Sequence, residues 1–456
     1  MDDETERPRN TQTESSSRLD FFSRNHLPQT ARSQCWRFAQ SLHPSSPVLE
    51  PPCQGHCSYT LLLPDHKTII QFRPPKHRLD LEITSAAHAI FGTLAPHTQL
   101  LGAITFAMSS PEHDNSNNNN NKNNNPSLIV YSHSLIEGTP LPSILSAHPE
   151  YPPSHPEPSL PSLNLEPLLT SLATSYFARS YTASLPSTSP LLAQLKRRVG
   201  QTLRQRLALL RAHLPARFRP VVEDVAGVFG ELEAGLPWAL THGDLCGAGV
   251  GNVFVQLRGR GRLLQDQEGG VDVELNGLID WAEGEYLPFG VGLYGVEEVL
   301  GRMVDVPVKG GGEGDKRRRF EYHPCAGRLR EVFWEELEAA VPALVEDKVL
   351  RKRVEKARLL GLLLWYGIAF DDGALDRVVC PGRDDEELQK LDLFLLGANH
   401  GGDTDTALIP EEDDASDKDS GCAFNNECDD AYAENLDCYS DSRNEAEGAC
   451  PVPGKL

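Results

Sequence analysis

Residues 241–255, THGDLCGAGVGNVFV, and residues 277–290, GLIDWAEGEYLPFG, are the stretches that decide the fold of this chain. Both place polar side chains at the ends of apolar, strand-like runs. Asp244 follows His-Gly, Asn252 precedes Val-Phe-Val, and Asp280 follows Gly-Leu-Ile. The two runs predict a strand hairpin, and a hairpin brings the ends that carry Asn252 and Asp280 side by side.

These polar residue types match the needs of phosphoryl transfer. That reaction requires oxygen ligands for a divalent metal ion and a carboxylate that orients and deprotonates the attacking hydroxyl. Asp244 offers such a carboxylate, Asn252 offers a neutral oxygen ligand, and Asp280 offers an anionic one. The pattern therefore predicts a Mg²⁺ site beside a catalytic carboxylate.

The same motifs resemble the aminoglycoside phosphotransferase-like (choline kinase-like) family of the protein-kinase fold. In that family His-Gly-Asp replaces the His-Arg-Asp of protein kinases, and Ile-Asp-Trp or a relative replaces Asp-Phe-Gly. The likeness covers about residues 33–400 and implies an α+β, protein-kinase-like two-lobed fold with a small β-rich N-lobe and a larger helical C-lobe. It further implies that ATP and Mg²⁺ bind between the lobes. By this resemblance His242 positions the catalytic loop, Asp244 is the catalytic carboxylate, and Asn252 and Asp280 are the metal ligands.

The resemblance also implies phosphate contacts in the N-lobe. Residues 54–60, QGHCSYT, resemble the phosphate-covering turn, with Gly55 and Ser58 near the phosphates. Arg73 stands where the family has its basic strand residue. Glu82, on the helix expected over residues 79–96, is its expected ion-pair partner.

The adenine contact is expected at the end of the N-lobe. Residues 128–138, LIVYSHSLIEG, resemble the hinge between the lobes. Backbone groups from Tyr131 to His133 are the expected partners of adenine.

Composition divides the chain into four parts. We expect a disordered N-terminus over 1–32, the N-lobe over 33–139 with an asparagine-rich loop insertion at 113–126, a helical C-lobe over 140–401, and a disordered acidic tail over 402–456. The tail holds 16 acidic and 2 basic residues between Asp403 and Glu447. Within the C-lobe, leucines at helical spacing predict one long amphipathic helix over 192–214, and GGGEGDKRRR, residues 310–319, predicts a flexible loop.

Charge, apolar runs and cysteines limit the class of protein. The net charge of −22 argues against nucleic acid as a partner. The apolar run at 359–370 is too short to span a bilayer, which predicts a buried core helix and no membrane partner. The N-terminus has no apolar signal segment, and the ten cysteines lack paired CxxC spacing. We therefore expect a cytoplasmic enzyme with free thiols, with its oligomeric state left open.

The spacing of the catalytic motif leaves two interpretations. Asn252 follows Asp244 by eight positions, three more than in the family pattern HGDxxxxN. The glycine-rich segment CGAGVG can bulge outward and return Asn252 to its place, which gives an ATP-dependent phosphotransferase acting on a hydroxyl of a small molecule. Alternatively, a displaced loop gives a catalytically weak pseudokinase that acts as a nucleotide-binding or interaction scaffold, with the acidic, cysteine-containing tail as its docking segment. The first interpretation is favoured, and the acceptor is not specified by the sequence.

Overall fold

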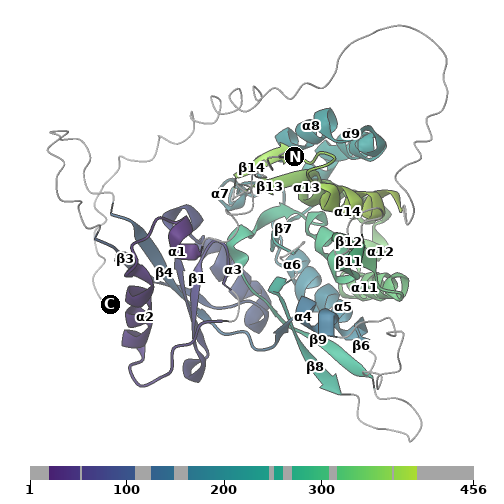
Figure 1. Ribbon diagram of the computed structural model, residues 1–456. Coiled ribbons are helices and arrows are strands. Elements are labelled where there is room, and N and C mark those ends of the chain that lie inside the picture. The colour runs from purple at the N-terminus through teal and green to yellow at the C-terminus, as the bar shows by residue number, and fades with distance from the viewer. Residues whose placement is uncertain are drawn as a thin grey trace, which may run out of the picture. The chain divides into compact units, whose positions relative to one another are not determined.

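The computed structural model describes residues 20–51, 54–107, 125–147, 163–245, 251–259, 270–307, 316–371 and 374–397. Most of the asparagine-rich insertion and the whole acidic tail lie outside these ranges, as do residues 246–250 of the long loop. The described residues form one compact unit. In that unit the two-lobed α+β architecture expected from the sequence is confirmed (Figure 1).

The N-lobe is built on an antiparallel sheet of four strands. The strands are β1 (Tyr59–Leu63), β2 (Thr68–Arg73), β3 (Thr98–Thr105) and β4 (Ser127–Ser134), in the order β1-β2-β4-β3. In β2 and β4 Gln71 pairs with Tyr131 and Ile69 pairs with His133. Because side chains alternate across a sheet, these residues and Arg73 share one face, and the apolar residues between them share the other.

The apolar face of this sheet packs against helices α1 (Phe21–Arg24) and α2 (Ala31–Leu42), as Figure 1 shows. Together they form a small hydrophobic cluster, the N-lobe cluster, whose buried members are Phe21, Phe22, Ala31, Cys35, Ala39, Val48, Tyr59, Leu61, Leu63, Ile70, Phe72, Phe106, Leu128 and Val130. The N-lobe therefore has a core of its own.

The beginning of this cluster corrects the expected disorder of the N-terminus for residues 20–32, while residues 1–19 lie outside the described ranges. The side chain of Asp20 accepts a hydrogen bond from Ser23 N–H at 2.8 Å and caps α1. Phe21 and Phe22 are buried against Tyr59, with ring centroids 6.2 and 4.8 Å away. The polar composition of the preceding residues favoured a prediction of disorder, although Phe21 and Phe22 belong to the N-lobe cluster.

Helix α3 (Leu81–Phe91) belongs to the other core, although it lies between two strands of the N-lobe in sequence. Its buried residues Ile83, Ala87 and Phe91 join the large cluster of the C-lobe. Phe91 stacks on Trp281 at 5.2 Å. The motif that contains Asp280 is thus packed against α3.

The C-lobe is mostly helical, as expected. Its helices of six or more residues are α4 (Leu141–Ala147), α5 (Glu166–Ser171), α8 (Leu203–His213), α9 (Arg219–Gly235), α10 (Tyr294–Val299), α11 (Ala326–Ala340), α13 (Lys348–Gly367) and α14 (Asp385–Leu396). The short helices are α6 (Ala178–Thr182), α7 (Leu192–Leu195) and α12 (Ala343–Glu346), and a π-helical turn, Leu172–Phe177, joins α5 to α6. The apolar run 359–370, expected to be a buried helix, is helical only as far as Gly367, where α13 ends, and its last three residues begin β13 (Ile368–Asp371). No helix in the described ranges is long and apolar enough to cross a membrane.

The long helix expected over residues 192–214 is wrong, because it is broken between α7 and α8. The buried carboxylate of Glu285 accepts hydrogen bonds from the backbone N–H groups of Arg197 at 3.2 Å, Val199 at 3.0 Å and Gly200 at 2.6 Å. A long-range side chain thereby takes the partners that a continuous helix would have used.

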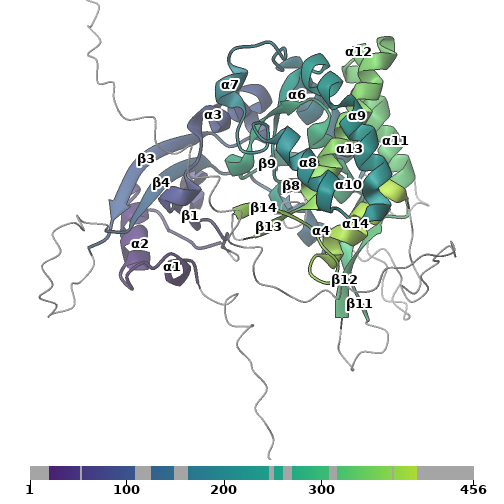
Figure 2. The same cartoon turned by 90° about the horizontal axis from the view of Figure 1, so that it is seen from above.

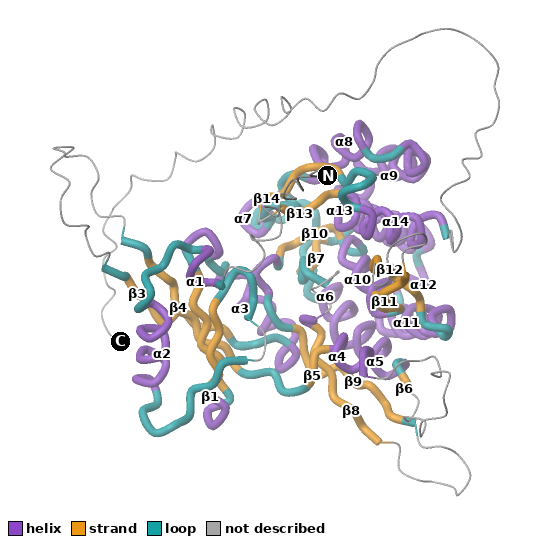
Figure 3. The backbone as a smooth tube through the Cα atoms, in the orientation of Figure 1, coloured by secondary structure: helices purple, strands orange, loops and turns teal. Residues whose placement is uncertain are grey.

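The C-lobe also contains short strands, seen most easily in Figure 3. They are β5 (Thr139–Pro140), β6 (Leu163–Asn164), β7 (Trp238–Thr241), β8 (Val253–Gly259), β9 (Val271–Leu278), β10 (Glu285–Pro288), β11 (Gly301–Pro307), β12 (Lys316–Tyr322), β13 (Ile368–Asp371) and β14 (Ala374–Val378). Strands β8 and β9 form the expected hairpin.

The flexible loop expected at 310–319 is partly a strand. Residues from Lys316 onward form β12, which pairs with β11 and lies beside α14 (Figure 2). Phe320 is buried, and its backbone exchanges two hydrogen bonds with the side chain of Gln389. The buried Phe320, rather than the basic residues at the start of β12, ties this strand to the C-lobe.

Candidate active site

The catalytic loop leaves the end of β7, which pairs with β10. Gly243 adopts a φ of +81°, and a Cβ atom there would lie 2.0 Å from the carbonyl oxygen of Glu283. Only glycine fits both the backbone conformation and this close approach. The His-Gly-Asp loop therefore packs directly on the turn that follows Asp280.

The buried side chain of His242 connects the His-Gly-Asp loop to the Ile-Asp-Trp motif. It is fully buried; its Nδ1 accepts a hydrogen bond from Asp244 N–H at 3.3 Å, so its Nε2 donates to the Ile279 carbonyl at 2.8 Å. Burial lowers the pKa of His242 to about 4, so the ring is neutral. Its ring also lies 4.6 Å from that of Trp281. These contacts hold the loop in position.

Asn252 contacts Asp244 despite the eight-residue separation. Its Nδ2 donates to the backbone carbonyl of Asp244 at 3.1 Å and to its carboxylate Oδ2 at 3.0 Å. The backbone carbonyl of Asn252 accepts a hydrogen bond from Ile279 N–H at 3.0 Å, which extends the β8–β9 pairing by one residue. The structure therefore brings Asp244, Asn252 and the residue before Asp280 together.

The surroundings of Asp244 alter its acidity. Burial, helped by the nearby Asp280 carboxylate, raises the pKa of Asp244 to about 7, although the hydrogen bond from Asn252 acts in the opposite direction. A carboxylate with a pKa near neutrality is well matched to proton transfer at that pH.

Asp280 has a strained backbone conformation. Its φ of 57° and ψ of 71° lie in the left-handed region, which a residue with a Cβ atom seldom adopts. Its Oδ1 accepts a hydrogen bond from Arg73 Nη2 at 2.7 Å. Desolvation acts to raise the pKa of Asp280, but the charge and the hydrogen bond of Arg73 outweigh it and leave that pKa below its ordinary value.

Arg73 is held by a chain of polar side chains that crosses the N-lobe sheet. It is only 2% exposed, and its Nε donates to Gln71 Oε1 at 2.7 Å. Gln71 Nε2 in turn donates to Ser58 Oγ at 3.0 Å, and a Cβ atom on Gly55 would lie 3.3 Å from the same oxygen. The turn containing Gly55 and Ser58 is thus connected through Gln71 and Arg73 to Asp280. Gln71 was missed by the sequence analysis, and its only signal is a polar residue inside the apolar strand β2.

The expected ion pair between Arg73 and Glu82 is wrong. Glu82 lies near the start of α3, its side chain is 72% exposed, and it lies 3.7 Å from Arg197 of the C-lobe. Asp80, the N-cap of α3, also pairs with Arg197. Glu82 points away because the inward-facing positions of α3 are taken by apolar residues that join the C-lobe cluster.

Tyr131 and His133 do not offer free backbone groups to adenine. Strand β4 is interior, and both residues are paired with β2 on one side and β3 on the other. The Tyr131 hydroxyl accepts from Leu79 N–H at 3.1 Å, just before α3, and His133 Nδ1 lies 2.9 Å from Thr98 Oγ1. The chain leaves the sheet only after Ser134, within the expected hinge segment 128–138 but beyond the residues expected to contact adenine.

The donor set suits a hard divalent cation bound with nucleotide phosphates. Asp280 and Asn252 supply carboxylate and amide oxygens, the ligand types that Mg²⁺ prefers. The Arg73 guanidinium adds fixed positive charge at the same place. The residues present therefore fit Mg²⁺ and a nucleoside triphosphate.

Three aromatic residues that the sequence analysis missed also contact the catalytic loop. Tyr176, Tyr294 and Trp365 each form a hydrogen bond with its backbone. Aromatic residues in apolar helices are usually core, so no local pattern marks these three.

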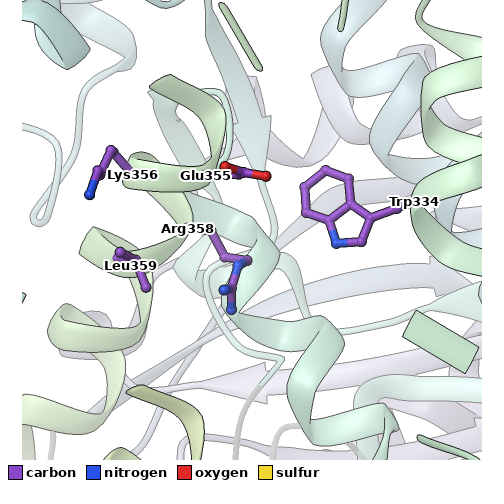
Figure 4. A pocket seen from close by; sticks show the side chains of 5 residues that line it. All are labelled: Trp334, Glu355, Lys356, Arg358 and Leu359. Carbon is purple, nitrogen blue, oxygen red and sulfur yellow. The ribbon is translucent and has the colours of Figure 1, made fainter. Parts of the chain in front are cut away.

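A separate surface pocket lies between α11 and α13 (Figure 4). It is lined by Trp334, Glu355, Lys356, Arg358 and Leu359. Its cations already have acidic partners, because Arg358 pairs with Glu297 at 3.2 Å and Lys356 pairs with Asp224. The pocket is not part of the candidate active site.

Comparison with known proteins gives matches among solved structures. No protein-family model and no curated protein sequence matches the chain. The GDP complex of wild-type aminoglycoside 2′-phosphotransferase-IIIa is similar at 11% identity, over 73% of this chain and 88% of that chain, with a TM-score of 0.39. Aminoglycoside phosphotransferase APH(4)-Ia is similar at 13% identity, over 75% and 94% of the two chains, with a TM-score of 0.37. Choline kinase LicA from Streptococcus pneumoniae is similar at 12% identity, over 72% and 98%, with a TM-score of 0.28. These proteins are of the kind that the two sequence motifs resemble.

Proposed function

We propose that the protein is an ATP-dependent phosphotransferase that transfers phosphate to a hydroxyl group of a small molecule. One observation carries the proposal: the side-chain amide of Asn252 donates a hydrogen bond to the Asp244 carboxylate at 3.0 Å, and the backbone carbonyl of Asn252 accepts one from the N–H of Ile279, the residue before Asp280. A base and two oxygen ligands are thereby assembled in one place from two distant motifs.

Each residue has a distinct task in this proposal. Asp244 orients the acceptor hydroxyl and takes its proton, for which a pKa of about 7 is suitable. His242 keeps Asp244 and Asp280 in register through its two ring nitrogens. Gly243 lets the loop approach the turn after Asp280 closely enough for that contact.

The nucleotide side of the site involves both lobes. Asn252 and Asp280 would hold Mg²⁺, which neutralises charge on the phosphates when it is bound. Arg73 would supply positive charge to the same phosphates from β2. Arg73 and Asp280 themselves form an ion pair at 2.7 Å.

The scaffold hypothesis rested on a displaced loop. The contact between Asn252 and Asp244 supports an intact catalytic arrangement instead. Residues 246–250 of the segment between them lie outside the described ranges, and the contact between Asp244 and Asn252 on either side of it supports the proposal.

The test is phosphate transfer from MgATP to named hydroxyl compounds, with an aminoglycoside, choline and homoserine as probes. Asp244→Asn should lower turnover by about 10²–10⁴-fold, the usual contribution of a general base. Its dissociation constant for MgATP should stay within about twofold, because the carboxylate acts on the acceptor. For the parent, kcat/KM should rise as the pH increases through about 7 and Asp244 loses its proton, whereas the variant should show no such rise.

Two results would contradict the proposal. One is a parent that binds MgATP but transfers phosphate to none of these compounds and hydrolyses none of it. The other is an Asp244→Asn variant that is as active as the parent.

A further inference from the structure

The backbone of the catalytic loop is held by the polar atoms of three aromatic side chains. The Tyr176 hydroxyl accepts from His242 N–H at 3.0 Å. Trp365 Nε1 donates to the Gly243 carbonyl at 2.9 Å, and the Tyr294 hydroxyl accepts from Leu245 N–H at 3.3 Å. Backbone groups on both sides of Asp244 are therefore fixed by side chains from elsewhere in the C-lobe.

These aromatic residues come from three different helical elements. Tyr176 lies in the π-helical turn between α5 and α6, Tyr294 begins α10, and Trp365 lies near the end of α13. Tyr176 and Tyr294 are 1% and 0% exposed, so their hydroxyl groups are removed from water. A loop held from three packed helices cannot shift unless the C-lobe core shifts with it.

The side chains are themselves fixed by ring contacts. Trp365 and Tyr294 stack with their centroids 4.2 Å apart and their planes at 13°. Tyr176 packs against Phe91 at 5.0 Å and against Trp281 at 6.2 Å. Such packing limits the rotamers of all three residues and therefore the position of the loop.

The π-helical turn places Tyr176 at this point. A π-helical turn adds one residue to a helix and rotates the positions after it, and such turns are frequent at functional sites. Here the turn ends at Phe177, one residue after the tyrosine that reaches His242. The irregular turn and the hydrogen bond to the loop therefore occur together.

We propose that Tyr176, Tyr294 and Trp365 act as an aromatic clamp that fixes residues 242–245. The clamp ends at Leu245, immediately before the lengthened segment, and the β8–β9 ladder fixes the chain again from Asn252 onward. The three additional residues therefore lie between two fixed parts of the chain. The greater length of this segment does not change the position of Asp244. The clamp residues are positioning residues, and their effect on catalysis rests on the proposed phosphotransfer.

The test combines hydrogen exchange with kinetics on the full-length protein. Tyr176→Phe should speed amide exchange at His242 by about tenfold or more, and Tyr294→Phe should do the same at Leu245, because each loses its hydrogen-bond acceptor. The triple variant Tyr176→Phe, Tyr294→Phe, Trp365→Phe should lower MgATP turnover by about 10–100-fold through misplacement of Asp244. Its dissociation constant for MgATP should stay within about twofold.

Tyr366→Phe is the matched control. Tyr366 is buried on α13 next to Trp365, and its hydroxyl donates to Glu298 at 2.9 Å. This variant should leave exchange at His242 and Leu245 and the turnover as in the parent.

The clamp is overturned if exchange at both amides is unchanged in the tyrosine variants, or if Tyr366→Phe gives the same effects. It is also overturned if turnover and MgATP affinity fall in parallel in the triple variant. A parent without phosphate transfer would contradict the proposed function, and the exchange rates alone would then decide on the clamp.

Discussion

The two halves of the candidate site are fixed in different ways. In the C-lobe half, His242, Asp244 and Asn252 are bonded to one another and to Ile279, and the loop backbone is bonded to aromatic side chains from three helical elements. In the N-lobe half, a single chain of side chains leads from Ser58 through Gln71 to Arg73. The half that contains Asp244 is held at many points, whereas the half that contains Arg73 is held at few.

The hydrophobic cores of the two lobes also differ, because the C-lobe core is the more extensive one. The N-lobe cluster is small and depends on α1 and α2, whereas the C-lobe cluster is large and includes α3. Arg73 and Asp280 form the ion pair that joins the two halves of the site. Because the two halves are held separately, we expect substitutions in the C-lobe half to alter the geometry around Asp244 and substitutions in the N-lobe half to alter nucleotide affinity.

The largest effect is expected from removing the beginning of the N-lobe cluster. Deleting residues 1–32 removes the buried side chains of Phe21, Phe22 and Ala31 and should lower the free energy of unfolding by on the order of 4 kcal/mol. Urea denaturation measures this loss. Deleting residues 1–19 is the control and should change the free energy little. Equal stability of the two truncated proteins would show that α1 adds nothing to the N-lobe core.

The next effect concerns the C-lobe half. Gly243→Ala should lower the free energy of unfolding by about 3 kcal/mol, since an L-residue is strained at a φ of +81° and its Cβ atom would overlap the Glu283 carbonyl. Gly227→Ala in α9 is the matched control, because a Cβ atom there meets nothing within 4 Å. It should stabilise the protein by about 0.5–1 kcal/mol, as expected for alanine inside a helix. Similar thermal denaturation of the two variants would contradict the close approach at Gly243.

The smallest effect tests the contact between the halves. Arg73→Ala should weaken ATP binding by about tenfold even without metal, because it removes positive charge from the phosphates, which corresponds to about 1.4 kcal/mol. Asp280→Ala should remove only the Mg²⁺-dependent part of ATP binding. Titration calorimetry with and without Mg²⁺ separates the two.

Arg204→Ala is the control for the loss of an arginine, since Arg204 pairs with Glu233 on the surface and its side chain is 66% exposed. It should leave ATP binding unchanged. If Arg73→Ala also binds ATP as the parent does, both with and without Mg²⁺, the N-lobe half has been assigned to the wrong residues.

The sequence predicted the C-lobe half better than the N-lobe half, for a physical reason. Asp244, Asn252 and Asp280 lie at the ends of short apolar runs, and hairpin geometry alone brings two of these ends together. The partner of Arg73 depends on which core α3 joins, and no local pattern encodes that choice. Glu82 was therefore assigned as the partner when the partner is Asp280.

Long-range contacts also limited the prediction of secondary structure. The leucine spacing over 192–214 was helical, but Glu285, far along the chain, takes the backbone N–H groups in its middle. In the same way the clamp residue Tyr176 lies 66 positions from His242, and Trp365 lies 122 positions from Gly243. Contacts of this kind depend on the packed fold and leave no mark on the nearby sequence.

The two anchored points around the lengthened loop have a consequence for the evolution of such motifs. When both ends of a segment are fixed independently, insertions and deletions between them do not disturb the residues outside. The number of positions between the Asp and the Asn can then drift among related chains while both side chains stay in contact. A search pattern that requires one fixed spacing would reject this chain, whereas one that treats the two anchors as separate blocks with a variable gap would accept it.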